Sequence, residues 1–146
     1  MKFILGLGSN LGNKSENLKL AISHIRKEIG KVTEISEFFQ SKPDGFLSDN
    51  DFFNCCICVE TRFSPLQLLQ VIQQIEIKMG RRHSLKRYED RIIDIDIILS
   101  ELKVSSKKLS LPHPLYTKRD FVIVPLADLT GFQDPQTFIT TSQLAL

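Results

Sequence analysis

The sequence predicts a single α+β domain with a ferredoxin-like, split βαβ arrangement, in which an antiparallel sheet is packed by helices. Short apolar stretches typical of strands alternate with two segments that carry a helical apolar stripe. Their order along the chain is strand, helix, strand, strand, helix, strand. The chain has 146 residues, of which 42% are hydrophobic and 25% are charged. These values suit one domain, residues 1–146, with a full-sized core.

The first half of the predicted order begins with a strand at residues 2–7 and a glycine-rich turn. A helix follows, with Asn13 suited to cap it and Glu16 at the capping-box position. Apolar residues then recur at helical spacing until Gly30, which is expected to end the helix. A second strand is expected at 32–39.

The second half begins with a long exposed loop at 41–51, which is rich in turn-forming and charged residues. A strand is expected at 52–61. Ser64 then precedes Pro and, three residues on, Gln, which is a strong helix start, and this helix is expected to run to Met79. A basic loop leads into the last strand of the pattern, at 91–99.

The chain beyond residue 99 gives weaker signals. A short polar connection leads to a turn with two prolines at 111–114, and residues 119–129 predict a further helix broken by Pro125.

Composition narrows the classes of partner. A net charge of +2 is too small to imply a nucleic-acid or membrane partner. The first strand turns to Gly, Ser and Asn too soon to form the apolar core of a signal peptide, so a cytoplasmic location is expected. A monomer is expected as well. Cys55, Cys56 and Cys58 lie on one predicted strand without zinc-site or disulfide spacing, so reduced, packed thiols are expected.

Two carboxylates interrupt the isoleucine-rich strand at 91–99. Because strand side chains alternate, Asp94 and Asp96 share one face, while Ile93, Ile95 and Ile97 share the other. Asp is unfavourable in strands and costly to bury unpaired, so the pair predicts a divalent metal site, with Mg²⁺ as the candidate. The simpler alternative is a solvated sheet face.

Basic residues crowd the segment just before this pair: Arg81, Arg82, His83, Lys86, Arg87 and Arg91. Guanidinium groups bind phosphate oxygens through paired hydrogen bonds, and a metal neutralises the remaining charge. The cluster beside the aspartates therefore favours a nucleoside triphosphate. A solvated loop or a weak nucleic-acid patch is the alternative.

The glycine-rich turn at residues 6–12 invites comparison with nucleotide-binding signatures. A Rossmann fingerprint needs Gly where Leu11 stands, and Asn13 interrupts the Gly-Lys-Ser ending of a P-loop. A structural turn with close backbone packing, which can still form a wall of a site, is the better interpretation.

Other side chains are candidates for a cleft beside the aspartates and the basic loop. Gln73 and Glu76 share one face of the second helix, although a solvated helix face explains them equally well. Strand alternation places either Phe52 or its neighbour beside the cleft with Asn54, and His113 is held between two prolines.

Taken together, these motifs resemble the 6-hydroxymethyl-7,8-dihydropterin pyrophosphokinase family over residues 3–128. The motifs that carry the resemblance are Gly8-Ser9-Asn10-Leu11, Phe53-Asn54, Glu76 with Gly80-Arg81 and Arg87-Tyr88, Asp90-Arg91-x-x-Asp94-Ile95-Asp96, Pro112-His113-Pro114 and Arg119-x-Phe121.

The resemblance implies an enzyme that transfers pyrophosphate from ATP to the hydroxymethyl group of the dihydropterin and releases AMP, as part of folate biosynthesis. It implies that Asp94 and Asp96 bind two Mg²⁺ ions, and that Arg81 and Arg91 stabilise the charge during transfer. The implied ATP-binding residues are Gln73, Glu76, Arg87, Tyr88, Arg91, Ile97, Lys108, Ser110, His113 and Arg119. The implied pterin-binding residues are Ser41, Lys42, Asp44, Phe52, Asn54 and Phe121.

The chain departs from the family pattern at several of these positions. Tyr88 stands where Trp is usual, Glu89-Asp90 replaces a typical Gly-Pro, and Phe52 replaces a frequent Tyr. Lys108 replaces an Arg of some members, while Lys42 and Asp44 replace apolar residues of the pterin-facing loop.

Two other functions use the same residues. A non-catalytic nucleotide- or RNA-binding ferredoxin-like module would use the basic loop as a patch and the aromatic residues for stacking. A metal-dependent phosphohydrolase would use the aspartates to release phosphate from ATP without an acceptor. The combination of pterin-like and nucleotide-like positions favours the pyrophosphokinase.

Overall fold

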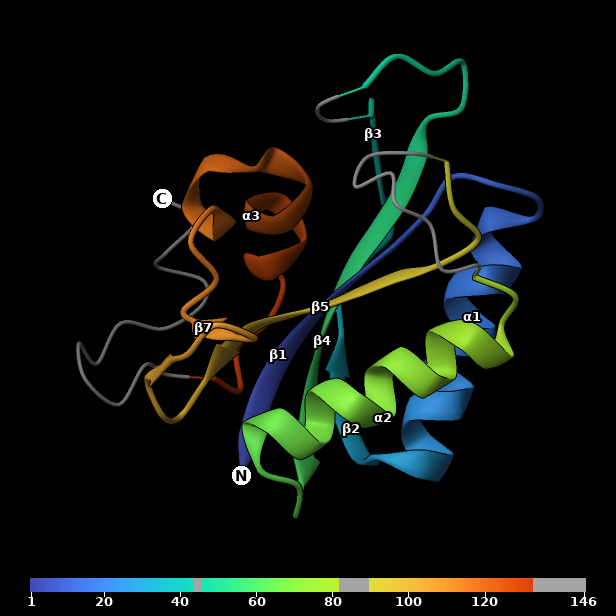
Figure 1. Cartoon of the computed structure of the whole chain (residues 1–146). Coiled ribbons are helices and arrows are strands. Elements are labelled where there is room, and N and C mark those ends of the chain that lie inside the picture. Colours follow the sequence, from blue (N-terminus) through green and yellow to red (C-terminus); the bar gives the residue numbers. More distant parts are fainter. Residues whose placement is uncertain (44–45, 82–89, 133–146) are drawn as a thin grey trace.

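A five-stranded antiparallel sheet organises the computed structural model, which describes residues 1–43, 46–81 and 90–132 (Figure 1). The strands run in the order β2-β4-β1-β5. β3 is off this path and pairs directly with β4, at Phe52–Asn54. Their bounds are β1 Lys2–Ser9, β2 Gly30–Ile35, β3 Phe39–Ser41, β4 Phe52–Thr61 and β5 Asp94–Ser100. Because β4 lies between β1 and β2, it splits the first β-α-β unit, and the ferredoxin-like prediction is confirmed.

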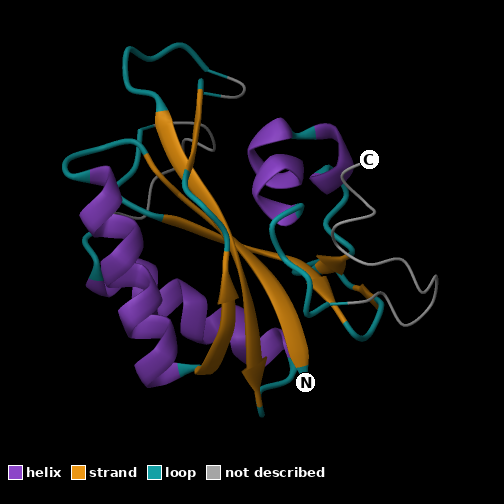
Figure 2. Cartoon of the chain, turned by 180° about the vertical axis from the view of Figure 1, so that it is seen from behind, coloured by secondary structure: helices purple, strands orange, loops and turns teal. Residues whose placement is uncertain are grey.

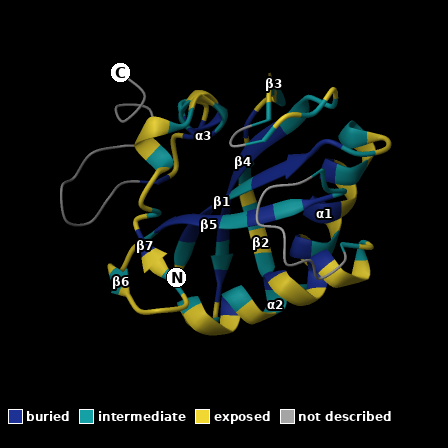
Figure 3. Ribbon diagram, turned by 45° about the horizontal axis from the view of Figure 1, so that its top comes forward, coloured by how far each residue is buried: buried dark blue, intermediate teal, exposed yellow. Residues whose placement is uncertain are grey.

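Helices α1 (Lys14–Glu28) and α2 (Pro65–Lys78) cover one face of the sheet (Figures 1 and 2). Their predicted starts are confirmed: the Asn13 side chain accepts a hydrogen bond from the Glu16 backbone, and Ser64 forms a complete capping box with Gln67. Apolar side chains from both helices and from alternate strand positions form the larger core, and Figure 3 shows the buried residues along the sheet.

Helix α3 (Asp120–Leu126) lies on the opposite face (Figure 2). It packs with Ile4, Cys56, Cys58 and Ile98 in a second, smaller core. A short hairpin, β6 (Val104–Ser105) with β7 (Ser110–Leu111), and the 3₁₀ helix η1 (Tyr116–Lys118) connect β5 to α3. The Leu111–Pro112 bond is cis. No helix within the described ranges is long and apolar enough to span a membrane.

Two predicted elements differ from the structure. The strand expected at 32–39 is divided into β2 and β3, because the Ser36 hydroxyl accepts the Cys56 N–H at 2.9 Å and takes the place of a strand carbonyl. The predicted break at Pro125 is wrong: α3 continues through it. Pro125 is the second-last residue of this helix and removes one N–H donor from the helical pattern.

Strand alternation explains which side chains face α3. Asp94 and Asp96 lie on this face of β5, whereas Ile95 and Ile97 belong to the core under α1 and α2. The three cysteines are buried and free, as expected, with Cys55 on one face of β4 and the other two on the opposite face.

Candidate active site

A cavity of about 620 Å³ lies on the α3 face of the sheet, between the strands and the segment from His113 to Val122. Its floor is formed by three neighbouring strands: Gly6 and Gly8 from β1, Asn54 from β4, and Asp94 and Asp96 from β5. The cavity therefore brings together residues that are far apart in the sequence.

The pairing of the strands places the floor residues in rows. Gly8 pairs with Asn54 on one side and with Asp94 on the other, and Gly6 pairs with Asp96. A side chain at Gly8 would place its Cβ 3.1 Å from Asn54 Oδ1 and 3.4 Å from the Phe52 ring. Glycine at this position therefore leaves room for the Asn54 amide and keeps the floor open.

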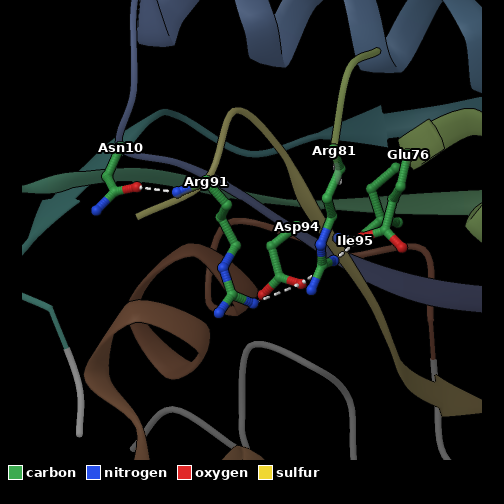
Figure 4. A network of polar contacts seen from close by, with 6 residues as sticks. All are labelled: Asn10, Glu76, Arg81, Arg91, Asp94 and Ile95. Atoms are coloured by element: carbon green, nitrogen blue, oxygen red, sulfur yellow. Dashed lines mark hydrogen bonds and ion pairs between the residues drawn. The ribbon is translucent and has the colours of Figure 1, made fainter. Parts of the chain in front are cut away.

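Two arginines converge on Asp94 from different segments of the chain (Figure 4). Arg81, just after α2, places Nη1 3.0 Å from Asp94 Oδ1, and Arg91 places Nη1 3.4 Å from the same oxygen. Arg81 also pairs with the buried carboxylate of Glu76, whose Oε2 accepts the Ile95 N–H at 3.0 Å. Glu76 thus fixes Arg81 from behind, so that the guanidinium group faces the cavity.

Burial and like charge change the acidity of the carboxylates. Burial raises the pKa of Glu76 to about 7, although Arg81 favours its charged form. Burial, with the neighbouring charges of Asp94 and Glu76, raises the pKa of Asp96. The neighbouring carboxylates of Asp94 and Asp96 therefore favour an added cation, because a cation beside them lowers the cost of keeping both charged.

The donor set fits a magnesium–nucleotide complex. Within the described residues, no three His, Cys, Asp or Glu side chains are grouped so that they could hold a metal by themselves. Mg²⁺ is usually bound by one or two carboxylates together with substrate phosphates and water. Asp94 and Asp96 supply that number, and the adjacent arginines suit the phosphates.

Aromatic residues form the other end of the cavity. The rings of Phe46 and Phe52 pack edge to face, with centroids 6.3 Å apart and planes at 87°. Phe121 also lines the cavity, and the Arg119 guanidinium carbon lies 5.4 Å from its ring centroid. Such rings can stack on a flat heterocycle.

Asn54 is oriented by its neighbours at this end. Its Nδ2 donates to the Phe39 carbonyl at 3.0 Å and to Ser41 Oγ at 2.8 Å, which uses both N–H groups. The amide therefore offers a ligand an acceptor, its carbonyl oxygen, and the Ser41 hydroxyl retains a proton to donate.

His113 lines the cavity beside β5. Its backbone N–H donates to the Ile98 carbonyl at 2.8 Å, and its Nδ1 accepts the Leu115 N–H at 3.2 Å. Burial and nearby Arg119 lower its pKa. Because Nδ1 accepts, the neutral ring carries its proton on Nε2, which is then the atom that can donate to a phosphate.

Most of the predicted site residues line this one cavity: Arg81, Arg91, Asp94, Asp96, His113 and Arg119 for the nucleotide, and Ser41, Lys42, Phe52, Asn54 and Phe121 for the pterin. Five predicted ATP contacts are not among its lining residues: Gln73, Glu76, Ile97, Lys108 and Ser110. Asp44, Arg87 and Tyr88 lie outside the described residues.

The positions of these five residues in the fold explain why their side chains do not line the cavity. The Ile97 side chain faces the core under α1 and α2 and therefore points away from the cavity. Gln73 is exposed on α2, on the other side of the sheet, and Glu76 is covered by Arg81. Lys108 and Ser110 are exposed in and beside the β6–β7 hairpin.

Phe46 is a cavity residue that sequence reasoning missed. The only signal for it was an aromatic residue within a mostly polar loop. Because Phe46 lies outside the predicted helices and strands, no apolar periodicity could show which way its ring points.

Comparison with known proteins gives a consistent result. A family model described as 7,8-dihydro-6-hydroxymethylpterin-pyrophosphokinase (HPPK) matches residues 4–131. A 2-amino-4-hydroxy-6-hydroxymethyldihydropteridine pyrophosphokinase from Porphyromonas gingivalis is 37% identical over 136 residues, covering 90% of this chain and 92% of the relative. The protein of the same name from Bacillus subtilis is 32% identical over 127 residues, covering 86% of this chain and 75% of the relative.

Solved structures share the fold. A triple mutant of HPPK-DHPS from Plasmodium falciparum, crystallised with SDX-DHP, superposes with a TM-score of 0.74 at 18% identity. The match covers 99% of this chain and 43% of that one, so this chain spans less than half of the longer protein.

Proposed function

This chain belongs to the 7,8-dihydro-6-hydroxymethylpterin-pyrophosphokinase family, and we propose that it transfers the two terminal phosphates of ATP, as one group, to the hydroxymethyl group of 6-hydroxymethyl-7,8-dihydropterin. The products are AMP and the dihydropterin diphosphate, which serves folate synthesis. One observation supports this above the others: a single cavity joins a carboxylate pair flanked by arginines to an aromatic pocket.

At the phosphate end, Arg81 and Arg91 are proposed to hold the ATP phosphates and to stabilise the charge that develops during transfer. Both already lie beside Asp94, so the phosphates would meet positioned donors. His113, through Nε2, and Arg119 are proposed as further ATP contacts. Gln73, Glu76, Arg87, Tyr88, Ile97, Lys108 and Ser110 complete the proposed ATP-binding set, with Glu76 acting through Arg81.

Asp94 and Asp96 are proposed to hold two Mg²⁺ ions. When bound, the ions would neutralise the phosphates and lower the pKa of the substrate hydroxyl. The chain then needs no covalent nucleophile, because phosphoryl transfer depends mainly on alignment and charge stabilisation.

At the aromatic end, Phe52 and Phe121 are proposed to stack on the pterin ring, and Phe46 to close its edge. Asn54 would accept a hydrogen bond from the heterocycle, and Ser41 would donate one. Lys42 lines the same end of the cavity, and Asp44 is the remaining proposed pterin contact. The ring would thereby direct its hydroxymethyl group towards the aspartates.

Membership of a pyrophosphokinase family does not favour the alternative function, a non-catalytic nucleotide- or RNA-binding module. Residues 1–146 are proposed to form one catalytic domain. The monomeric state and the cytoplasmic location expected from the sequence stay predictions.

Nucleotide chromatography tests the proposed reaction. The protein is incubated with ATP, Mg²⁺ and 6-hydroxymethyl-7,8-dihydropterin, beside reactions that lack the pterin or contain a chelator in place of the metal. We expect AMP in the complete mixture alone. ADP or phosphate formed without the pterin would instead indicate a hydrolase, and AMP formed in the presence of the chelator would contradict the metal assignment.

A further inference from the structure

We propose that Asp90 is a positioning residue that holds Arg91 in place and ties it to the segment leading to the aromatic end of the cavity. This inference rests on the proposed function, because it concerns how the two substrate ends are aligned. Asp90 does not line the cavity, so it acts through its neighbours. The neighbours are Asn10, at the end of β1, and Ser48 and Asn50, ahead of β4.

The Asn10 amide is the centre of the arrangement and is only 1% exposed. The Asn10 Oδ1 accepts the Arg91 N–H at 2.7 Å (Figure 4). The Asn10 backbone N–H donates to the Arg91 carbonyl at 3.1 Å. Its Nδ2 donates to Asp90 Oδ1 at 2.7 Å and to the Asn50 carbonyl at 3.2 Å. Asn10 therefore holds the Arg91 backbone at both its N–H and its carbonyl group.

Asp90 determines which way this amide points. An amide buried between a donor and an acceptor has one correct orientation, with its NH₂ group towards the acceptor. The Asp90 carboxylate is a charged acceptor at 2.7 Å, so it keeps Asn10 Oδ1 directed at the Arg91 N–H. The Arg91 side chain then reaches Asp94.

The second oxygen of Asp90 binds the other segment. Asn50 Nδ2 donates to Asp90 Oδ2 at 3.0 Å, and the Asn50 backbone N–H donates to Ser48 Oγ at 3.1 Å. Hydrogen bonds from Ser48, Asn50 and Asn10 lower the pKa of Asp90, so it stays charged at neutral pH. One carboxylate thus joins the segment between Phe46 and Phe52 to Arg91.

Three single variants, and the double variant that combines Asp90→Ala with Asn50→Ala, test the inference against a matched control. Asp90→Ala removes both acceptor oxygens, Asp90→Asn keeps one, and Asn50→Ala removes one donor while its backbone carbonyl remains. Asp49→Ala removes an exposed carboxylate from the same segment and serves as the control. For each protein we would measure hydrogen exchange of the Arg91 amide by NMR without substrates, kcat and KM for both substrates, and Tm.

We expect Arg91 amide exchange in Asp90→Ala to be about tenfold faster, and kcat to fall by about tenfold, because a charged hydrogen bond contributes a factor of this size. Asp90→Asn should lie between Asp90→Ala and the wild type. Since Asp90 and Asn50 act as one unit, adding Asn50→Ala to Asp90→Ala should cost little more. Asp49→Ala should match the wild type in every measurement.

Exchange and kcat in Asp90→Ala equal to those of Asp49→Ala would overturn the inference. A lower Tm with unchanged kcat and KM would do so too, because it would show a role in stability alone. The exchange experiment needs no substrate, so it separates this inference from the proposed function, which fails if the wild type itself makes no AMP.

Discussion

Asp94 and Asp96 share one face of β5, but their surroundings differ. Asp94 lies beside two guanidinium groups, whereas burial and the charge of Asp94 raise the pKa of Asp96. A sheet designed for stability alone would not place two carboxylates on one enclosed face. The pair is therefore better explained by the cation and phosphates that the proposed reaction requires.

Asp96→Ala should reduce kcat by about 1,000-fold or more, because it removes one of two proposed metal ligands. Tm should be unchanged or higher, since an unfavourable half-buried carboxylate is lost. The measurement is AMP formation at saturating ATP and pterin, together with a thermal melt. Glu60→Ala, which removes a partly exposed strand carboxylate far from the cavity, is the control. Retained turnover in Asp96→Ala would refute the metal assignment.

Phe46 and Leu47 are neighbours with opposite surroundings, and they form a matched pair. Phe46 packs against Phe52 in the cavity, whereas the Leu47 side chain is fully exposed. Phe46→Ala should raise KM for the pterin by about tenfold, since an aromatic contact contributes about 1 kcal/mol beyond buried area. KM for ATP should change little. Leu47→Ala should leave both KM values unaltered, and equal effects of the two substitutions would contradict the proposed role of Phe46.

At the level of elements, close strand pairing sets strict limits on side-chain size. Gly30 begins β2 opposite Thr61, and a Cβ placed there would lie 2.1 Å from the Glu60 carbonyl oxygen. A Cβ at Gly12 would make only an ordinary contact, 3.8 Å from Asn17 Nδ2, but the φ of +68° disfavours other residues. The two glycines are therefore needed for different reasons.

Gly30→Ala should lower the free energy of unfolding by about 3 kcal/mol, because the backbone must move to relieve the clash. Gly12→Ala should cost about 1 kcal/mol, which is the cost of the left-handed backbone conformation. Urea denaturation measures both. An equal loss in the two variants would show that the pairing of β2 with β4 adapts more readily than the structure indicates.

The sequence was sufficient to predict elements whose signals are local. Asn13 and Ser64 cap helices as predicted, and alternation placed Asp94 and Asp96 on one face. The break at Ser36 was not predictable, because it depends on a hydrogen bond to Cys56, twenty residues away. The same limitation applies to the site. Spacing along α2 could not show that Glu76 lies behind Arg81 instead of in the cavity.

At the level of the whole molecule, the cavity depends on how α3 is held against the sheet. The chain after α3 is fixed to β2 by Glu34, whose carboxylate accepts the Thr130 N–H at 3.0 Å and the Thr130 hydroxyl at 2.8 Å. Asp128 accepts the Glu37 N–H at 3.0 Å in the same region. These contacts hold α3 and the chain that follows it against the smaller core.

Glu34→Gln should lower Tm by about 3 °C at pH 7. Although burial opposes it, hydrogen bonding from Thr130 and Gly131 lowers the pKa of Glu34 in the folded protein. This stabilisation is complete above the unfolded pKa and is lost as pH falls through the folded value. The difference in Tm between wild type and variant should therefore shrink below about pH 4. A constant difference across pH 3–7 would contradict this role of the Glu34 charge.

The pairing of Gly8 with both Asn54 and Asp94 has a consequence for how such an enzyme can diverge. Neighbouring strands stand about 4.8 Å apart, so the proposed pterin contact Asn54 and the proposed metal ligand Asp94 are two strand spacings, or about 10 Å, apart. This gap is a property of the sheet and does not depend on any side chain. Substitutions around the rim, such as the lysine at 42, can alter what the site prefers. They leave unchanged the distance across which the two substrates must meet.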